Sequence, residues 1–364
     1  MKNLSFRAYE TFSFFASLRM THKVISKLGH CPSAEWHLFL CNGIGWISSG
    51  AELCSIALMN NAMLLKPSTI ALAQITSALG DIKRNVDTHA AWCERAIERG
   101  ATAIIFPELS LTGYALRDLN FECALGLEAP ELAPLKKLSK KITIIAGAVE
   151  SDARGAVYNS ALLFENGEVK HTHRKVYPPT YGIFEEGRYF TSGRSADAYT
   201  SDRVGSIGLM VCEDLWHPAL PYLEALGGAQ LLITIAASPT RLDSGEEASH
   251  SGIPDIYTIN REHHAAYARL LGCFVIFVNR VGVEDGVNFW GGSEVVAPSG
   301  ETIARAKFFE EDLVIAEIDP AQVRQARQRS RHFLDDDPLL TQHLLARLIG
   351  MKAVPIGSEE STSN

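Results

Sequence analysis

The 364-residue sequence lacks a surplus of positive charge. It has 34 Lys and Arg residues against 42 Asp and Glu residues, which gives a formal net charge of −8 at pH 7 with histidine neutral. A protein that binds nucleic acid neutralises phosphates with basic side chains, so we do not expect nucleic acid to be the main partner. The content of 46% hydrophobic and 21% charged residues is instead typical of a soluble globular protein with a sizeable core.

Cysteine and histidine patterns for disulfide frameworks and metal sites are also missing. The number of cysteines is odd, and no two of them have CxxC spacing. This usage favours a reducing compartment, so we expect a cytoplasmic protein. The histidines form no HExxH pattern, so nothing in the sequence supports a metal site. The seven cysteines are Cys31, Cys41, Cys54, Cys93, Cys123, Cys212 and Cys273.

No segment is both long enough and apolar enough to be a membrane-spanning helix. Residues 12–18 are apolar but too short to cross a bilayer. Residues 45–65 are longer but include Ser48, Glu52 and Asn60. We therefore expect neither a membrane span nor a secretory signal. The chain also lacks a P-loop and a GxGxxG phosphate cradle, so we expect no ATP-using synthetase domain in it.

Patterning divides the chain into three regions. Residues 1–66 show no clear strand–helix alternation and form an N-terminal extension of unknown role, for which poor order is one option. Residues 67–319 are well patterned. Residues 320–364 begin with the basic run AQVRQARQRSRHF, become acidic at Asp335, and end in the polar tail SEESTSN. We expect a C-terminal helix, either solvated or packed at an oligomer interface, followed by a disordered tail.

The patterned region alternates strands with helices. Helical periodicity occurs at 85–99, 131–140, 220–226 and 261–271. Short apolar runs bounded by turn residues predict strands at 68–74, 103–106, 142–149, 157–165, 168–174, 207–211, 231–236, 273–279, 294–297, 302–306 and 313–318. This mixture predicts an α/β fold. So many strands are too many for one strongly twisted open sheet, which favours two packed sheets.

The strand at 207–211 ends abruptly in Cys212, which the acids Glu213 and Asp214 follow. A thiol just past a buried strand is held rigidly and can still face a cleft. It can act as a nucleophile if a nearby group accepts its proton. The alternative is a buried structural cysteine, because free cysteine packs like a small hydrophobic residue.

Two further charged residues stand where predicted strands end. Glu108 follows the strand at 103–106, and Lys175 follows the strand at 168–174. A partly desolvated glutamate can serve as a general base, and a fixed lysine can stabilise an oxyanion. Taken singly, each can equally be structural: Glu108 as a capping or surface residue, Lys175 as an exposed strand-end residue.

The three residues lie in three motifs, FPELSLTGY, HRKVYPPTYGIFEEGRYFTSG and IGLMVCEDLW. In this order and spacing the motifs resemble the nitrilase superfamily of carbon–nitrogen hydrolases, and the resemblance covers residues 68–318. It implies a four-layer α-β-β-α sandwich, commonly dimerised through the face that carries the nucleophile, so we expect a homodimer or a larger homo-oligomer. It also implies a Glu–Lys–Cys triad of Glu108, Lys175 and Cys212, within a carbon–nitrogen hydrolase domain at 67–319.

The same resemblance suggests further site residues. The segment FEEGRYF looks like the part of glutamine-using members that carries a second, substrate-orienting glutamate, and it aligns Glu186 with that position, with Glu185 as the alternative. The backbone N–H of Glu213 is expected to bind the oxyanion. Three aromatic residues that flank the motifs are possible pocket residues, although each can also be structural. They are Tyr114, Tyr181 and Trp216.

The segments CEDLW and YGIF look most like the glutaminase portion of glutamine-dependent NAD synthetases. We expect a hydrolase that cleaves a non-peptide amide bond of a small molecule through a thioester on Cys212. The reaction would release ammonia or an amine and need no cofactor. One alternative is a glutaminase subunit that delivers ammonia to a separate synthetase. Another is an inactive scaffold or binding protein of the same fold, against which the three occupied triad positions argue.

Overall fold

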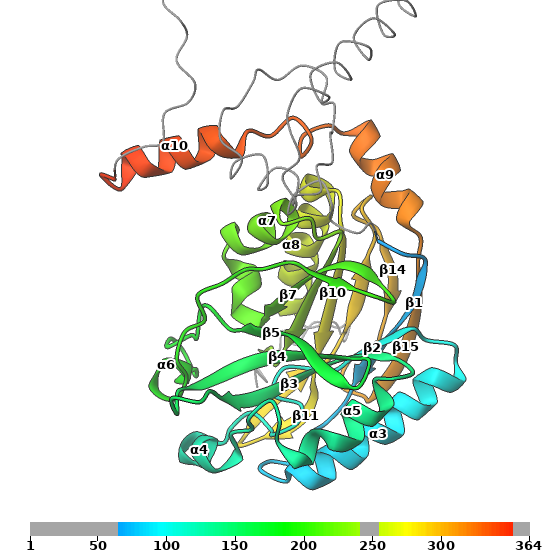
Figure 1. Cartoon of the computed structure of the whole chain (residues 1–364), viewed down its shortest axis with the longest axis vertical. Coiled ribbons are helices and arrows are strands. Elements are labelled where there is room, and N and C mark those ends of the chain that lie inside the picture. The colour runs from blue at the N-terminus through cyan, green and yellow to red at the C-terminus, as the bar shows by residue number, and fades with distance from the viewer. Residues whose placement is uncertain (1–64, 241–254, 352–364) are drawn as a thin grey trace, which may run out of the picture. The chain divides into compact units, whose positions relative to one another are not determined.

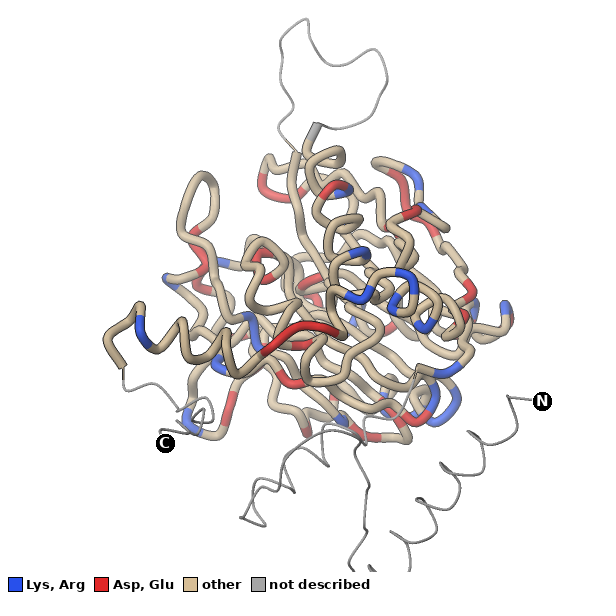
Figure 2. The backbone as a smooth tube through the Cα atoms, turned by 90° about the horizontal axis from the view of Figure 1, so that it is seen from above, with Lys and Arg blue, Asp and Glu red and all other residues tan. Residues whose placement is uncertain are grey.

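The computed structural model describes residues 65–240 and 255–351 (Figure 1). Nearly all of the predicted N-terminal extension and the predicted disordered tail lie outside the described residues. Basic and acidic positions are distributed over the described chain (Figure 2). No helix within the described ranges is long and apolar enough to cross a membrane.

The first sheet has the strand order β15-β1-β2-β3-β4-β5. Strands β1, β2 and β3 are parallel to one another, whereas β15, β4 and β5 join as antiparallel neighbours. The hairpin between β4 and β5 turns at Asn166 and Gly167, both of which have positive φ, as the Asn-Gly pair predicts. The strands are β1 (Ser68–Gln74), β2 (Ala103–Ile105), β3 (Thr143–Ser151), β4 (Val157–Glu165), β5 (Glu168–Arg174) and β15 (Asp312–Ile318).

The second sheet has the order β14-β13-β10-β8-β7-β6. Its central strands β7, β8 and β10 are parallel, so their carboxyl ends meet at one edge of the sheet. The residues that follow these three ends are Cys212, Ala237 and Arg280. The strands are β6 (Tyr199–Ser201), β7 (Gly205–Val211), β8 (Leu231–Ala236), β10 (Phe274–Asn279), β13 (Glu294–Val296) and β14 (Thr302–Arg305).

Helices cover the outer face of each sheet, and the sheets pack against each other. Along β1, Ile70 and Leu72 belong to the core between the two sheets, whereas Ala71 and Ala73 pack under the helices, as a strand buried on both faces requires. Helices α3 (Ile82–Glu98) and α5 (Ala133–Leu138) cover the first sheet, and α7 (Ala219–Leu226) and α8 (Asp255–Leu271) cover the second (Figure 1). The predicted four-layer α-β-β-α sandwich is therefore confirmed.

The structure differs from the predicted elements at several ends. Helix α3 begins three residues earlier than predicted, because the Asp81 side chain caps it by accepting from the Arg84 N–H at 3.0 Å. Helix α8 begins at Asp255, six residues before the predicted start. A small third sheet was not predicted, because its strands are too short to show a period. It contains β9 (Pro239–Thr240), β11 (Val281–Glu284) and β12 (Val287–Trp290).

The remaining elements are short or lie near the C-terminus. Helix α9 carries the predicted basic run, and its Val323 packs into the core between the sheets. Helix α10 buries none of its residues. The short helices are η1 (Arg117–Leu119), α4 (Asn120–Cys123), η2 (Pro130–Leu132), α6 (Glu186–Tyr189) and η3 (Cys212–Trp216); α9 and α10 span Pro320–Arg329 and Pro338–Leu348.

Candidate active site

Cys212 stands at a sharp turn between β7 and η3. Its φ of 45° lies in the left-handed region, which is unusual for a residue with a side chain and stores strain. The turn ends the fully buried strand β7 and leaves Cys212 half-buried. The thiol is thus fixed by the backbone at the carboxyl edge of the second sheet.

A buried aspartate that sequence reasoning missed holds this turn. The Asp214 carboxylate accepts the Val211 N–H at 3.1 Å and also pairs with His173 Nε2 at 2.9 Å. Its other oxygen accepts the N–H groups of Val176 and Tyr177, each at 3.0 Å. Asp214 therefore ties the Cys212 turn to the segment that follows Lys175. Its only sequence signal is its place in the CEDLW motif.

Glu108 lies between the two sheets. Its side chain is 1% exposed, and one carboxylate oxygen accepts from Lys175 Nζ at 2.8 Å and from Asn159 Nδ2 at 2.7 Å. The other oxygen accepts the Ala237 N–H at 2.7 Å. Asn159 belongs to β4 of the first sheet and Ala237 follows β8 of the second. The carboxylate is thus fixed from both sheets, and neither of these two donors was predicted.

A glycine makes room for the Glu108 turn. A Cβ atom on Gly147 of β3 would lie 2.3 Å from the Leu109 nitrogen and 2.6 Å from the Pro107 carbonyl oxygen. Both distances are far below van der Waals contact, and the atoms belong to the backbone. The close approach of β3 to this turn therefore requires glycine.

Lys175 is buried between two glutamates. Its Nζ lies 2.8 Å from Glu108 Oε1 and 2.7–2.8 Å from the two carboxylate oxygens of Glu186. Burial lowers the pKa of Lys175, but the carboxylates of Glu108 and Glu186 outweigh burial and raise the pKa well above its ordinary value. The side chain is therefore an ammonium group at neutral pH.

Glu186, rather than Glu185, lies against Lys175. Glu186 begins α6 and is 5% exposed, whereas Glu185 is exposed. Burial raises the pKa of Glu186, Lys175 lowers it, and the nearby Glu108 raises it again, with a net upward shift. The Tyr114 hydroxyl donates to Glu186 at 2.7 Å, so the phenol also helps to fix this carboxylate.

Tyr114 is held in turn by a buried ion pair. The Glu284 carboxylate accepts the N–H groups of Tyr114 and Ala115 at 2.8 and 2.7 Å. Its other oxygen accepts from Arg280 Nη2 at 2.9 Å. The third sheet, which presents Glu284, thereby positions the aromatic residue that contacts Glu186.

The resting thiol of Cys212 is protonated. Burial raises its pKa, Glu108 raises it, and Lys175 lowers it, with a net value well above the ordinary one. The positive charge of Lys175 alone does not produce a thiolate. Formation of a thiolate at Cys212 therefore requires a proton acceptor.

The other predicted site residues take separate positions. The Tyr181 hydroxyl donates to the Glu213 side chain at 2.8 Å, and Tyr181 is 58% exposed. Trp216 is exposed and packs its edge against His263, with ring centroids 4.5 Å apart. Tyr114 lines a cavity of about 340 Å³ together with Glu186, Phe184 and Phe289. This cavity has the size of a small-molecule site and adjoins the Lys175 cluster through Glu186.

No group of three or more His, Cys, Asp or Glu side chains is arranged to hold a metal ion in the part of the chain that the structure describes. The four cysteines at described positions are free thiols, and only Cys212 among them is not fully buried. Its accessibility separates it from Cys93, Cys123 and Cys273.

The α-β-β-α sandwich, the cysteine with positive φ and the buried Glu–Lys–Glu cluster are the features expected of the carbon–nitrogen hydrolase class that the motifs resemble. The profile of the carbon–nitrogen hydrolase family matches residues 69–328. The chain belongs to this family, as its motifs predicted.

Curated relatives include two glutamine-dependent NAD(+) synthetases at 30% identity. The protein from Thermotoga maritima aligns over 262 residues, which is 70% of this chain and 42% of the relative. The protein from Synechocystis aligns over 272 residues, 69% of this chain and 46% of the relative. The chain thus spans less than half the length of these relatives.

Solved structures show the same fold. A carbon–nitrogen hydrolase from Helicobacter pylori has a TM-score of 0.67 at 27% identity, covering 78% of this chain and 99% of that one. The glutamine-dependent NAD+ synthetase from Acinetobacter baumannii has a TM-score of 0.63 at 28% identity, covering 71% and 47%. An amidase from Nesterenkonia has a TM-score of 0.57 at 26% identity, covering 74% and 98%.

Proposed function

We propose that the protein hydrolyses a non-peptide amide bond of a small molecule through a thioester on Cys212. The observation that carries this proposal is the Lys175 ammonium, clamped between Glu108 and Glu186 beside the turn that presents Cys212. Within this cluster Glu108, Lys175 and Cys212 are the proposed catalytic residues, and Glu186 is the proposed substrate-orienting residue.

In the first step Glu108 accepts the proton of the Cys212 thiol. The sulfur attacks the amide carbonyl carbon, a carbon–sulfur bond forms, and the carbonyl π electrons move to oxygen. The raised thiol pKa makes this transfer necessary, because little thiolate is present beforehand. The Asn159 and Ala237 hydrogen bonds keep the Glu108 carboxylate in place for the transfer.

The tetrahedral oxyanion is then stabilised by positive charge and by N–H donors. Lys175 supplies a fixed ammonium group, and the backbone N–H of Glu213 is the second proposed donor. One such donor typically lowers the barrier by about 3 kcal/mol. When the intermediate collapses, the carbon–nitrogen bond breaks and the protonated Glu108 gives its proton to the leaving nitrogen. Ammonia or an amine departs, and the acyl group remains on Cys212.

Hydrolysis of the thioester repeats the same chemistry with water. Glu108 takes a proton from water, whose oxygen attacks the thioester carbonyl. The second tetrahedral intermediate expels the Cys212 sulfur, which regains its proton from Glu108, and the acid product leaves. The sum is an amide plus water giving an acid plus ammonia or an amine, and Glu108 carries every proton transfer.

The relatives support a second candidate. Both curated relatives described above are named glutamine-dependent NAD(+) synthetases, and the chain aligns with less than half of each. The same site chemistry can act as a glutaminase that delivers ammonia to a separate synthetase. A structural relative described as an amidase supports the first candidate, a free-standing amidase, because the match covers 98% of that chain.

One experiment tests the proposal and separates these candidates. The full chain is incubated with a panel of small amides that includes glutamine, and ammonia release is measured. We expect turnover of at least one amide, its loss in Cys212→Ala, and an acyl adduct on Cys212 by mass spectrometry in Glu108→Gln. Cys93→Ala is the matched control, because Cys93 is a free, buried cysteine of α3 in the core beneath the helices of the first sheet.

The outcomes are distinct. Glutamine as the best substrate, with turnover raised by a separate synthetase, favours the glutaminase. Turnover that survives in Cys212→Ala contradicts the covalent mechanism. A folded wild-type chain whose seven thiols all react equally slowly, and which hydrolyses nothing in the panel, favours an inactive scaffold.

We further infer a cytoplasmic homodimer that pairs through the helices beside the nucleophile. Leu223 of α7 and Ile259 and Leu270 of α8 expose large apolar side chains on the helical layer that covers the second sheet. Burial of such residues against a second copy would stabilise the pair. Light scattering on the full chain should give twice the chain mass, and Leu223→Glu with Leu270→Glu should give a monomer.

A further inference from the structure

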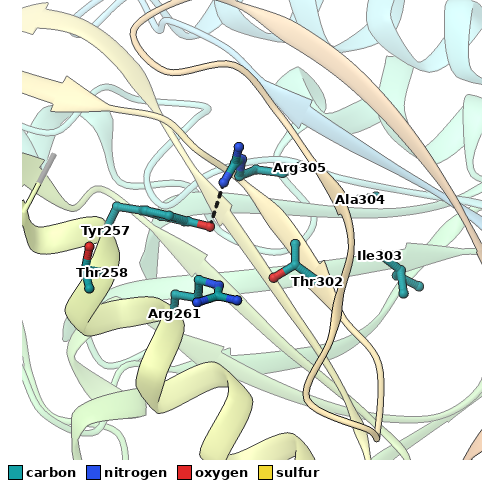
Figure 3. A pocket seen from close by; sticks show the side chains of 7 residues that line it. All are labelled: Tyr257, Thr258, Arg261, Thr302, Ile303, Ala304 and Arg305. Atoms are coloured by element: carbon teal, nitrogen blue, oxygen red, sulfur yellow. Dashed lines mark hydrogen bonds between the residues drawn. The ribbon is translucent and has the colours of Figure 1, made fainter. Parts of the chain in front are cut away.

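The larger of the two cavities described in this structure is not the one beside the triad. It measures about 610 Å³ and lies between the first half of α8 and the edge strand β14. Tyr257 and Arg261 come from α8, and Thr302 and Arg305 come from β14 (Figure 3). The two cavities share no lining residue. We call this second site the α8–β14 hollow.

Arg305 is preorganised at the hollow. Its Nη1 donates to the Tyr257 hydroxyl at 2.9 Å. Its guanidinium carbon lies 5.3 Å from the ring centroid of Tyr257 and also 5.3 Å from that of Phe308. Contacts with two aromatic faces and one hydrogen bond restrict the Arg305 side chain. A guanidinium group has five N–H donors, and only one of them is used here among the described residues. Most of its donors therefore remain for a ligand, with little ordering required on binding.

Hydrogen bonds at the floor of the hollow hold Tyr257 in place. Tyr257 is 5% exposed, and its hydroxyl donates to buried Glu294 at 3.3 Å. Glu294 is also held by His264 Nδ1 at 2.8 Å and by the Thr302 hydroxyl at 3.2 Å. The Glu294 carboxylate thus accepts hydrogen bonds from groups beneath the surface, and it forms no ion pair with Arg261 or Arg305.

Within residues 65–240 and 255–351, the two arginines of the hollow have no carboxylate partner. Neither Arg261 nor Arg305 lies within ion-pair distance of an Asp or Glu side chain at any described position. Figure 3 shows the Arg261 side chain extending from α8 toward Thr302, so both guanidinium groups border the same space. Two cations that form no ion pair with a described residue, at one cavity, are unusual on a chain whose formal net charge is −8.

We propose that the α8–β14 hollow binds a small molecule that carries a multiply charged oxyanion group. Two guanidinium forks match the oxygens of a phosphate or a paired carboxylate, and the Thr258 hydroxyl can donate to the same group. The exposed Ile303 side chain offers an apolar contact for the rest of the ligand. The cavity volume is that of a small-molecule site rather than of a single ion.

Calorimetry on the full chain at low ionic strength tests the proposal, with inorganic pyrophosphate and citrate as separate probes. We expect saturable binding of at least one probe with one site per chain, and the preferred probe tells a phosphate ligand from a carboxylate ligand. Arg261→Gln with Arg305→Gln should weaken that binding at least about tenfold, because the charge-assisted hydrogen bonds of both guanidinium groups to the ligand are lost. Arg84→Gln, an exposed arginine on α3, should bind like the wild type.

Two results would overturn the proposal. One is the absence of saturable binding for both probes, and the other is equal binding by the wild type and the double variant. If loss of the Tyr257 contact unfolds the double variant, Arg261→Gln alone keeps the test decisive, since Arg261 is exposed and without an ion-pair partner at described positions. Arg261→Lys, which keeps the charge but not the fork, should retain part of the affinity.

Discussion

Replacing Glu186 by glutamine removes one of the two negative charges that flank Lys175 and keeps the shape of the side chain. In the wild type both Glu186 oxygens lie 2.7–2.8 Å from Lys175 Nζ, and the Tyr114 hydroxyl lies 2.7 Å from one of them. Glu108 remains as the second partner of the lysine. The change therefore weakens the cluster without leaving Lys175 unpaired.

The size of the effect follows from the bond that is lost. A hydrogen bond between two charged groups contributes about 1.5–3 kcal/mol, which corresponds to roughly 10- to 150-fold in rate if the bond acts in the transition state. We expect kcat/KM for amide hydrolysis to fall by that factor in Glu186→Gln. The change should also move the thiol pKa of Cys212. Because the Glu186 charge raises the pKa of Cys212, its removal should lower that pKa.

Two assays on the same protein read these quantities. Ammonia release gives kcat/KM, and the pH dependence of alkylation by iodoacetamide gives the thiol pKa. Glu185→Gln is the matched control, because it makes the same chemical change at an exposed neighbouring residue and should behave like the wild type. The reasoning is refuted if Glu185→Gln loses activity while Glu186→Gln keeps it, or if the Cys212 pKa rises in Glu186→Gln.

Three further predictions concern stability and the support of the site. Burial, with help from Asp197 and Asp214, raises the pKa of Glu224 from 4.5 to about 8. Because the folded state then binds this proton more tightly, the wild type should lose a few kcal/mol of unfolding free energy as pH rises between these values. Urea titrations at pH 5 and pH 8 should show this loss in the wild type and not in Glu224→Gln. Gly147→Ala should reduce both the melting temperature and amide turnover, because its Cβ would meet the Leu109 nitrogen at 2.3 Å. Asp214→Asn turns an amide N–H₂ group toward N–H donors and should lower the unfolding free energy by roughly 3–5 kcal/mol, measured by denaturant titration.

Each of these has an outcome that contradicts it. A wild type whose unfolding free energy does not fall between pH 5 and pH 8 would disprove the raised pKa of Glu224. A Gly147→Ala protein with wild-type turnover would show that the Glu108 turn tolerates a shift. Wild-type stability in Asp214→Asn would mean that contacts other than those of Asp214 hold the Cys212 turn.

Local patterns were enough to predict most of the fold. Buried strands appear as short apolar runs between turn residues, so β1, β7, β8 and β10 are visible without the structure. The Asn166-Gly167 turn is equally legible, because few residue pairs accept two positive φ angles. Strands of two to four residues, such as β9 and β11, are stabilised by their partners and carry no period of their own.

For the site, local motifs were enough to predict the family and the positions of Glu108, Lys175 and Cys212, because each sits in a motif at the end of a strand. The groups that surround these three residues are visible only in the folded chain. Glu186 rather than Glu185 meets Lys175, since one short helix turns adjacent side chains in different directions. Asn159 and the Ala237 N–H reach Glu108 from 51 and 129 residues away, and Arg261 and Arg305 come to one hollow from a helix and an edge strand. Such contacts depend on how the layers pack, which no local pattern records.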